Sequence, residues 1–458
     1  MGTQENILHN SRPCRVSDVE SPRGAAVVDI LLQDCRLMPI TFSHFAQALE
    51  VETAFSVLAV ARRLQGSGKD VVELEIGDSP FPTTAQAAQA GVAAIAEQQT
   101  KYGPSLGLPE FRQAAADFVQ REFDIPASAE NVAAGPGAKI FEQFFCEAFL
   151  NPGDGVLIFN PWFPTYGPNI ERRAARAVYR PLRQVDNFRP RISDVEDFLN
   201  TDEAPRAIFL NSPHNPTGGV TTSQDLHDLA DLIRGRDIIV FSDEPYCHMI
   251  WQGRHHSLAA LPSMLDQCVA TYTFSKSWSM SGWRLGFCVS SVDITEMIGR
   301  MINTSLSCIP PFVQHAGIAA MRSDTEERDT SMNHFGNKVR LITDGLNQLD
   351  GFHALPPAAT FYVFPNVAPV CNRLGITSHG LAMYLLEGAD DAFGIACLGG
   401  ECFGSAGAGF LRFSCAEPDD RLRQAIAFIP QALSRQNRIT AWLETHPEFR
   451  QNDHYDEP

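Results

Sequence analysis

Helical and strand-like segments alternate along most of this chain, and that alternation limits the folds that it can adopt. Residues 85–97 and 108–123 have helical periodicity. Short apolar or β-branched runs that end at polar residues or at Gly and Pro occur at residues 155–160, 207–211, 237–243, 269–274 and 284–290. Helical stretches lie between several of these runs, an order typical of a mainly parallel sheet covered by helices. We therefore predict an α/β fold.

Polar side chains stand at the ends of three of the predicted strands. Asn211 and Asp243 end their runs, and Ser275 directly follows another. In sheets of this kind, ligands bind beyond the carboxyl ends of the strands. We therefore expect these side chains to lie near a ligand site.

The composition disfavours several classes of partner. The 458 residues carry a net charge of −18, whereas nucleic acids and anionic membranes bind basic patches. No apolar run reaches the roughly 18 residues that span a bilayer, and residues 1–20 lack the apolar core of a signal peptide. The eleven cysteines show no C-x-x-C pair and no metal-ligand spacing. We expect reduced thiols, a cytoplasmic protein and no metal site.

Lys276 lies in the most informative segment, Thr-Phe-Ser-Lys-Ser-Trp-Ser-Met-Ser-Gly-Trp-Arg at residues 273–284. The chain has few lysines, because arginine supplies most of its 36 basic residues. A lysine framed by hydroxyls suits a Schiff base with an aldehyde cofactor, with the hydroxyls and Arg284 holding the phosphate of that cofactor. An ordinary surface lysine is the alternative interpretation.

Two loops add anchoring groups for a ligand. The loop at residues 135–139 precedes a predicted helix at residues 140–150, and a helix start of small residues favours an anion such as phosphate. Asn211-Ser-Pro-His-Asn-Pro-Thr-Gly218 is a rigid loop from which Asn215 can donate to a ligand oxygen. Ordinary Gly/Pro loops are the alternative for both.

Two charged side chains stand in apolar strands and need partners. Asp243 in Asp-Glu-Pro-Tyr246 would be stabilised by a protonated ring nitrogen, and Tyr246 can donate to a phenolate oxygen of the same ring. Arg412 in Gly-Phe-Leu-Arg-Phe-Ser-Cys suits a carboxylate. A helix-capping aspartate and a structural ion pair are the alternatives.

Together and in this order, these segments resemble the class I/II aminotransferases, pyridoxal-phosphate enzymes of fold type I, the aspartate aminotransferase fold. The resemblance extends from about residue 57 to residue 428. The motifs that carry it are Gly77-Asp-Ser-Pro-Phe, Tyr102-Gly-Pro-Ser-Leu-Gly-Leu-Pro-Glu-Phe-Arg112, the loop at 135–139, Asn160-Pro-Trp-Phe-Pro164, Asn215-Pro-Thr-Gly, Asp243-Glu-Pro-Tyr246, Ser275-Lys276 with Arg284, and Arg412-Phe-Ser.

The resemblance implies a role for each matching residue. It makes Lys276, Asp243 and Tyr246 catalytic, with Lys276 bound to pyridoxal 5′-phosphate and Asp243 paired with the ring nitrogen. Phe163 would stack on the ring, and Tyr102 would reach the phosphate in a neighbouring subunit. Cofactor contacts are implied for Gly137, Ala138, Lys139, Phe163, Asn215, Asp243, Tyr246, Thr273, Ser275, Lys276, Arg284 and Tyr102, and substrate contacts for Gly77, Arg412 and Lys139.

The resemblance also implies an architecture and an activity. We expect an N-terminal arm at residues 1–45, a smaller α+β domain from 46–84 and 320–432, a large cofactor-binding domain at 85–319, and a C-terminal tail at 433–458. A homodimer with shared sites would transfer the amino group of an amino acid to a 2-oxo acid. Asn160-Pro161 and Asn215-Pro216 are the expected cis peptide bonds.

Three questions stay open at this point. Lys139 either neutralises the cofactor phosphate or reads an acidic or polar substrate. A lyase, decarboxylase or cyclase on the same fold would share every residue named here. A ligand-sensing regulator with an aminotransferase-like domain is a further alternative, but the N-terminal arm is short and not basic enough for a DNA-binding module.

Overall fold

The computed structural model describes residues 40–49 and 51–457. The chain divides into two compact units, residues 1–48 and residues 49–458. In the first unit, the described residues form one short helix, α2 (His44–Ala48). Most of the predicted N-terminal arm lies outside the described residues. The rest of this description concerns the second unit.

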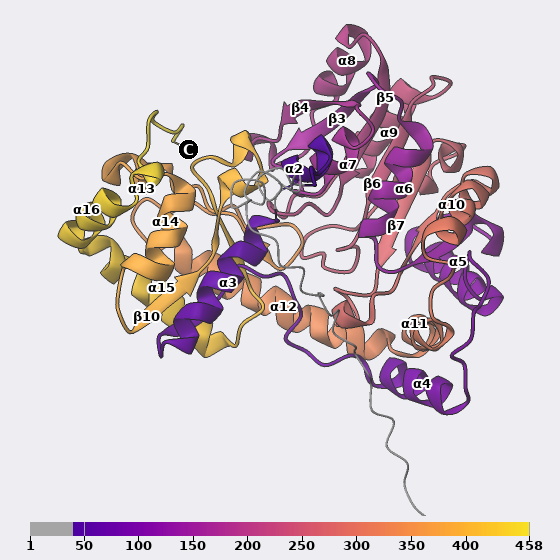
Figure 1. The fold of residues 1–458 in the computed structure, drawn as a ribbon, viewed down its shortest axis with the longest axis horizontal. Coiled ribbons are helices and arrows are strands. Elements are labelled where there is room, and N and C mark those ends of the chain that lie inside the picture. Colours follow the sequence, from indigo (N-terminus) through magenta and orange to yellow (C-terminus); the bar gives the residue numbers. More distant parts are fainter. Residues whose placement is uncertain (1–39, 50, 458) are drawn as a thin grey trace, which may run out of the picture. The chain divides into compact units, whose positions relative to one another are not determined.

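A seven-stranded sheet forms the centre of the larger part of this unit (Figure 1). Its order is β2-β8-β7-β6-β5-β3-β4, and β8 is antiparallel to both of its neighbours while the other pairs are parallel. The prediction of an α/β fold with a mainly parallel sheet is therefore confirmed. The strands are β2 (Val132–Gly135), β3 (Gly155–Asn160), β4 (Arg176–Pro181), β5 (Pro205–Asn211), β6 (Ile239–Asp243), β7 (Cys268–Thr273) and β8 (Gly286–Val289).

Helices cover both faces of this sheet. Successive side chains of a strand point to opposite faces, and in β3 Leu157 belongs to one buried apolar cluster while Val156 and Ile158 belong to another. The first cluster includes residues of α4, α5, α8, α9 and α11, and the second includes residues of α6, α7 and α10. These helices are α4 (Ala85–Ala96), α5 (Pro109–Phe123), α6 (Lys139–Phe149), α7 (Tyr166–Glu171), α8 (Ile192–Thr201), α9 (Ser223–Ile233), α10 (Val292–Ser305) and α11 (Pro311–Ser323).

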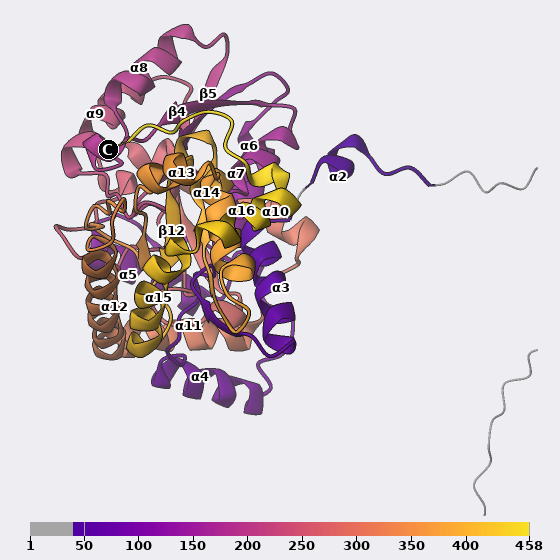
Figure 2. The same ribbon diagram turned by 90° about the vertical axis from the view of Figure 1, so that its left-hand side faces the viewer.

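A second core joins both ends of the unit. Residues of α3 and of the last helices share one apolar cluster, which contains Val57, Phe335 and Trp442. Figure 1 shows α3 on the same side of the unit as α13–α16, and Figure 2 shows α12 next to α15. The helices are α3 (Thr53–Gly66), α12 (Thr325–Leu346), α13 (Ala368–Leu374), α14 (Ser378–Met383), α15 (Asp419–Ser434) and α16 (Gln436–Thr445).

Short strands complete this second part. β1 (Asp70–Glu73) pairs in parallel with β10 (Phe393–Ala396), and β12 (Leu411–Ser414) pairs antiparallel with β11 (Leu398–Gly399) and β9 (Tyr362–Val363). Helices and strands of both kinds therefore surround this core. The boundaries of the two domains remain a prediction, with the second core as their basis.

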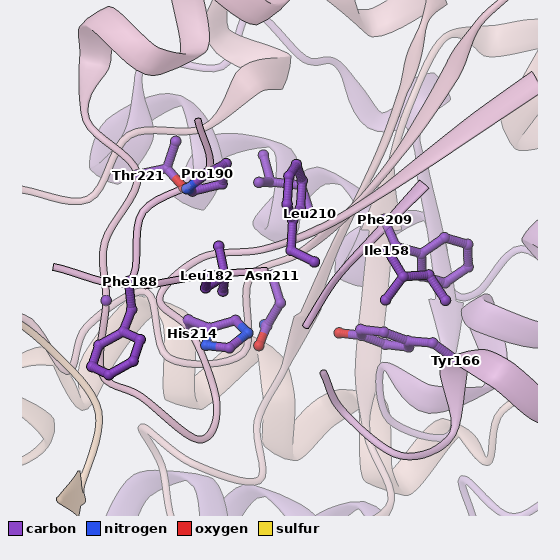
Figure 3. A pocket seen from close by; sticks show the side chains of 12 residues that line it. Ile158, Tyr166, Leu182, Phe188, Pro190, Phe209, Leu210, Asn211, His214 and Thr221 are labelled. Carbon is purple, nitrogen blue, oxygen red and sulfur yellow. The ribbon is translucent and has the colours of Figure 1, made fainter. Parts of the chain in front are cut away.

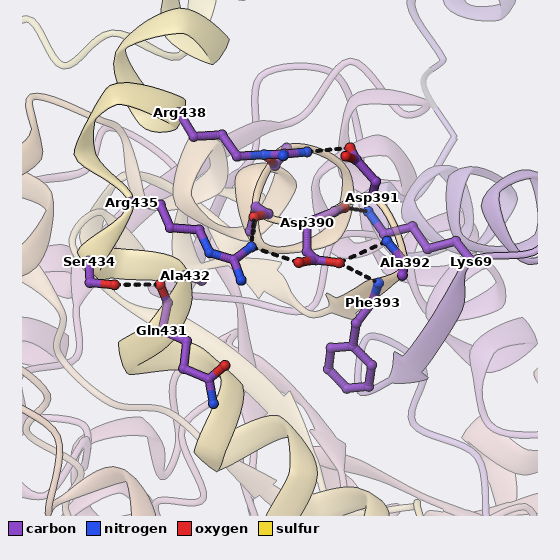
Figure 4. Close-up of polar contacts among 12 residues, drawn as sticks. Lys69, Asp390, Asp391, Ala392, Phe393, Gln431, Ala432, Ser434, Arg435 and Arg438 are labelled. Carbon is purple, nitrogen blue, oxygen red and sulfur yellow. Dashed lines mark hydrogen bonds and ion pairs between the residues drawn. The ribbon is translucent and has the colours of Figure 1, made fainter.

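The predicted C-terminal tail begins inside α15 and includes α16, which packs against the second core and forms ion pairs with neighbouring side chains. Ile439, Trp442 and Leu443 are buried in the second core. Figure 4 shows the polar contacts that hold this helix, a group of side chains that we call the α16 anchor, which comprises Lys69, Asp390, Asp391, Arg435 and Arg438.

Each charge of the α16 anchor meets partners within the chain. Arg435 contacts Asp390 at 2.8 Å, Arg438 contacts Asp391 at 2.5 Å, and Lys69 Nζ donates to the carbonyl oxygen of Asp390 at 2.7 Å. The backbone N–H of Ala392, followed by Arg435, lowers the pKa of Asp390 to about 2. These contacts fix the start of α16.

Two kinds of feature are absent from the described residues, a membrane-spanning helix and a metal-binding cluster. No helix among them is both long enough and apolar enough to cross a membrane. Within the same residues, no three His, Cys, Asp or Glu side chains are grouped so that they could hold a metal ion.

Candidate active site

A pocket of about 340 Å³ lies where the polar ends of β5, β6 and β7 meet. Strand register sets Asn211 opposite Asp243, and Asp243 opposite Thr271. The segment after β7 adds Ser275 and Lys276 to the wall. The predicted site residues that line this pocket are Gly77, Ala138, Lys139, Phe163, Asn215, Asp243, Tyr246, Thr273, Ser275, Lys276, Arg284 and Arg412.

Asp243 is a buried carboxylate of this pocket, with 7% of its surface exposed. Its Oδ2 accepts a hydrogen bond from the Tyr166 hydroxyl at 2.6 Å, and its Oδ1 accepts one from the Thr271 hydroxyl at 3.3 Å. Burial raises the pKa of Asp243 to about 6, although the two hydrogen bonds act in the opposite direction. Among the described residues no cation forms an ion pair with it, so a cationic ligand atom would stabilise its charged form.

Three of the four cationic side chains in the pocket form no ion pair within the described part of the chain. They are Lys276, Arg284 and Arg412. Lys276 Nζ donates to the Gly77 carbonyl oxygen at 2.5 Å, and the guanidinium of Arg284 donates to the carbonyl oxygens of Ser281 and Pro136 at 2.8 and 3.0 Å. Cations that meet only carbonyl oxygens can still bind anions strongly.

Arg412 is the most enclosed of these cations. Its guanidinium lies 4.3 Å from the centre of the Tyr362 ring and donates to Asn215 Oδ1 at 3.0 Å and to the carbonyl oxygen of Glu75. Its Nε has no hydrogen-bond partner among the described residues. A buried arginine with an unused donor is suited to a ligand carboxylate.

The loop at residues 135–139 approaches Arg284 closely. Gly137 has a φ of 91°, and a Cβ atom on it would lie 2.7 Å from Arg284 Nη2. Helix α6 begins at Lys139, so the N–H groups of its first turn have no partner within the helix. Glycine therefore permits a cradle in which a guanidinium and helix N–H groups face the same ligand group.

Lys139 differs from the other pocket cations, because a carboxylate neutralises it. Its Nζ pairs with Glu52 and lies 5.1 Å from the centre of the Phe163 ring. Glu142, one turn further along α6, also lines the pocket. Burial, followed by the charge of Asp243, raises the pKa of Glu142 to about 8.

Two predicted site residues do not line the pocket. Gly137 lies behind Arg284, and Tyr102 is 90% exposed on the surface. The prediction of cis peptide bonds is confirmed at Asn160-Pro161 and Asn215-Pro216, and Ser212-Pro213 is also cis.

Four polar residues in or next to the pocket were not predicted from the sequence: Glu52, Glu142, Tyr166 and Tyr362. One of them carried a usable signal, because Glu142 stands three positions after Lys139 in a helix rich in phenylalanine. Tyr166 and Glu52 act across long sequence separations, which a single sequence does not reveal.

A smaller cavity of about 10 Å³ lies behind the pocket, between Tyr166, Asn211 and His214 (Figure 3). It has room for about one water molecule. Burial lowers the pKa of His214 to about 3, and its Nδ1 contacts the Thr217 hydroxyl at 2.8 Å. Because Tyr166 and Asn211 also contact Asp243, this cavity belongs to the same site.

The residues present fit pyridoxal 5′-phosphate, the cofactor that the resemblance implies. Asp243 lacks a cation, as a partner of a protonated ring nitrogen would. Lys276 is a pocket amine without a carboxylate, and Arg284 with the Gly137 loop offers donors for a phosphate. Arg412 remains for the carboxylate of an amino acid.

Comparison with known proteins leads to the same family. The chain matches the family model "Aminotransferase class I and II" over residues 69–429. It is 30% identical to an aspartate aminotransferase of Pyrococcus abyssi, over 81% of this chain and 94% of that protein. It is 29% identical to an arginine–pyruvate transaminase of Pseudomonas aeruginosa, over 80% of this chain and 90% of that protein.

A solved structure has the same fold. It is the aspartate aminotransferase of Thermus thermophilus with maleate. The two structures superimpose with a TM-score of 0.79 and 26% sequence identity, and the match covers 86% of this chain and 100% of the other. The fold is therefore fold type I, as predicted. The family match extends over most of the chain, and the chain belongs to the class I and II aminotransferases, enzymes that use pyridoxal 5′-phosphate to transfer amino groups between amino acids and 2-oxo acids.

Proposed function

We propose that transamination takes place in the pocket around Lys276, with Asp243, Arg284 and Arg412 in the roles that the resemblance implies. The observation that carries this proposal is the set of three pocket cations without a carboxylate partner in the described chain. Arg284 accounts for the cofactor phosphate and Arg412 for the substrate α-carboxylate. Lys276 is then the pocket cation left to act on the carbon atoms that react.

The side chains divide the work of the reaction among themselves. When bound, the cofactor supplies an aldehyde that captures the substrate amine and a ring that withdraws electrons from the substrate Cα. Asp243 keeps a proton on the ring nitrogen, and the Tyr166 hydroxyl holds Asp243 in place at 2.6 Å. Nζ of Lys276 takes the proton from Cα and returns it to the former aldehyde carbon.

Arg412 and Asn215 orient the substrate for this proton transfer. A bidentate contact with the α-carboxylate fixes which Cα bond faces Lys276. Arg412 is itself fixed by Asn215 Oδ1 and by the carbonyl oxygen of Glu75. Tyr246, whose hydroxyl donates to the Tyr362 hydroxyl at 3.2 Å, is placed to hold the phenolate oxygen of the cofactor ring together with Asn215.

The amino donor is the open part of the function. The two relatives named above are described as acting on aspartate and on arginine, so the family does not fix the donor. Lys139 lines the pocket and is the side chain that an acidic or polar donor would meet. The two kinds of donor would use Lys139 differently. A side-chain carboxylate needs a Lys139 ammonium that no other carboxylate neutralises, whereas an uncharged polar group needs only one hydrogen bond from it.

We also infer a homodimer with shared sites. Tyr102, the residue expected to reach the neighbouring phosphate, is 90% exposed and so available to a second subunit. Analytical ultracentrifugation would show a dimer, and mixing Tyr102→Phe with Lys276→Ala protein would restore part of the activity in hybrid dimers. A fully active monomer would contradict this inference.

A cytoplasmic location is our proposal on the basis of the thiols. The nine cysteines that the structure describes are all free. Thiol titration of denatured protein purified without reductant would then find all eleven cysteines of the sequence reduced. Disulfides in freshly isolated protein would contradict this location.

A single-turnover experiment tests the proposed reaction. Holoenzyme mixed with an amino donor, without an acceptor, would release one equivalent of 2-oxo acid for each cofactor and then stop. A second 2-oxo acid would restore the starting absorbance. A lyase or decarboxylase would instead release ammonia or carbon dioxide through many turnovers, and that result would overturn transamination.

A further inference from the structure

Within the described residues of one chain, the pairing of the pocket cations leaves no positive charge for a third anionic group. The pocket contains Lys139, Lys276, Arg284 and Arg412, and among the described residues a carboxylate pairs only with Lys139. The three others suffice for the cofactor and for the substrate α-carboxylate. A donor with a second carboxylate would need Lys139, which Glu52 already occupies.

Glu52 is placed for this contact by the start of α3. It precedes the helix in the N-cap position, yet its side chain makes no capping hydrogen bond to the first turn. The carboxylate instead reaches Lys139, and Ala54 and Phe55 of the same turn also line the pocket. The side chain of Glu52 is 22% exposed and that of Lys139 is 45% exposed, so solvent only partly screens the pair.

A dicarboxylic donor would meet an unfavourable arrangement here. It would have to separate Lys139 from Glu52 and would then lie near an unpaired carboxylate. Burial raises the pKa of Glu142 to about 8, so at neutral pH this carboxyl group is largely protonated and adds no negative charge of its own. An amide or hydroxyl, in contrast, can accept from Lys139 and donate to Glu52 while the pair stays intact.

We propose that Glu52 is a specificity-determining residue that excludes side-chain carboxylates, so that the amino donor carries an uncharged polar side chain, an amide or a hydroxyl. This inference rests on the proposed function of the pocket. In this inference, Glu52 accepts a hydrogen bond from the substrate side chain and Lys139 donates one to it.

The test compares Glu52→Gln with the wild-type holoenzyme, using donors that differ only in charge. The pairs are glutamate with glutamine and aspartate with asparagine. In the wild type we expect the amide donor to exceed the acid in kcat/KM by about tenfold or more, and in Glu52→Gln we expect the acid to gain roughly ten- to hundredfold. Glu52→Gln combined with Lys139→Ala should lose this gain, since no ammonium then remains for the carboxylate.

Glu97→Gln is the matched control, because Glu97 is an exposed carboxylate just after α4, and it should leave the acid-to-amide ratio unchanged. A wild type that prefers glutamate to glutamine would overturn the proposal. So would a Glu52→Gln enzyme with an unchanged acid-to-amide ratio.

Binding without turnover separates this proposal from the proposed function. Calorimetry would measure the Kd of succinate and of butanoate for the wild-type and the Glu52→Gln holoenzymes. The two ligands differ by one carboxylate. The Glu52→Gln substitution should lower the Kd of succinate about tenfold and leave the Kd of butanoate unchanged. That result in a protein with no transaminase activity would support the role of Glu52 and refute the proposed function, whereas an unchanged succinate-to-butanoate ratio would refute the role of Glu52.

Discussion

Charged side chains have opposite surroundings in the pocket and in the α16 anchor. In the anchor, Asp390 contacts Arg435 and two backbone N–H groups, and its pKa falls to about 2. In the pocket, Asp243 accepts only neutral hydrogen bonds, and burial raises its pKa to about 6. The anchor satisfies its charges within the chain, so it contributes to structure. The pocket leaves charges unsatisfied, and those charges are available to ligands.

Removal of Lys276 tests this comparison most severely. Lys276→Ala should lower kcat by at least about 10⁴-fold, because both the covalent link and the proton transfer are lost. The measurement is kcat with a saturating donor, together with the absorbance of the bound cofactor. Lys338→Ala is the control, since Lys338 pairs with Asp419 at 2.8 Å outside the pocket and should keep its activity. A Lys276→Ala enzyme with a tenth of normal turnover would refute the assigned role.

Asp243→Asn should have the next largest effect. The amide keeps the shape of the side chain but no longer stabilises a protonated ring nitrogen, so kcat should fall about 10²–10³-fold. Cofactor content after dialysis should stay near one per subunit. Asp237→Asn, which alters an exposed ion pair with Arg206, is the control. Near-normal turnover in Asp243→Asn would show that this carboxylate has no part in the reaction.

Arg412→Lys distinguishes an arginine kept for a ligand from one used for structure. Lysine keeps the charge but loses the fork that holds a carboxylate, so kcat/KM should fall about 10–100-fold. Most of the loss should appear in KM, for the donor and for the 2-oxo acid alike. A change confined to the melting temperature would instead place Arg412 with the anchor arginines.

Glu142→Gln should change the pH dependence of stability. The pKa of Glu142 is about 8 in the folded protein, above its ordinary value of 4.5. The wild type therefore loses stability as the pH rises from about 4.5 to 8, because the unfolded chain releases this proton first. The variant should gain stability relative to the wild type across that range, by on the order of 1–4 kcal/mol at pH 8. Denaturant unfolding of cofactor-free protein measures it, and Glu147→Gln, on the more exposed side of α6, is the control.

Arg435→Ala should have the smallest effect and should affect stability alone. Partly exposed ion pairs contribute about 0–1 kcal/mol, so the melting temperature should fall by a few degrees at most. The contribution of Asp390 is present above pH 3.8 and is lost as the pH falls through about 2, so the difference between wild type and variant should shrink there. Kinetic constants should not change, and a change in KM would break the distinction between the two regions.

The sequence predicted those parts of the fold and the pocket that depend on neighbouring residues. Asp243 ends a strand whose apolar run is visible, and Asn215 and Lys276 follow two others, so their gathering at one edge of the sheet could be expected. The reversed direction of β8 could not, because periodicity carries no direction. β4 was missed for a physical reason, since it is an edge strand in which no residue is fully buried, so it lacks the apolar run of an inner strand.

The contacts that tune the pocket could not be read from the sequence. Tyr166 and Asp243 are 77 positions apart, and Glu52 and Lys139 are 87 apart. A tyrosine at the start of a helix and a glutamate before a helix have many ordinary uses, and only the fold decides which partner each one meets. The proposed substrate preference rests on the pair of Glu52 and Lys139, so the motifs alone could not suggest it.

The pairing of β1 with β10 has a consequence for the order in which the chain folds. Asp70 pairs with Phe393, which the ribosome adds roughly 15–60 s later at about 5–20 residues per second. The strands of the seven-stranded sheet, which end at Val289, are all synthesised within that interval. β1 and α3 are therefore synthesised long before the later residues that cover their apolar side chains. Glu52 and Phe55 stand at the start of α3 and line the pocket, so this wall of the pocket is among the last parts of the enzyme to reach its final packing during synthesis.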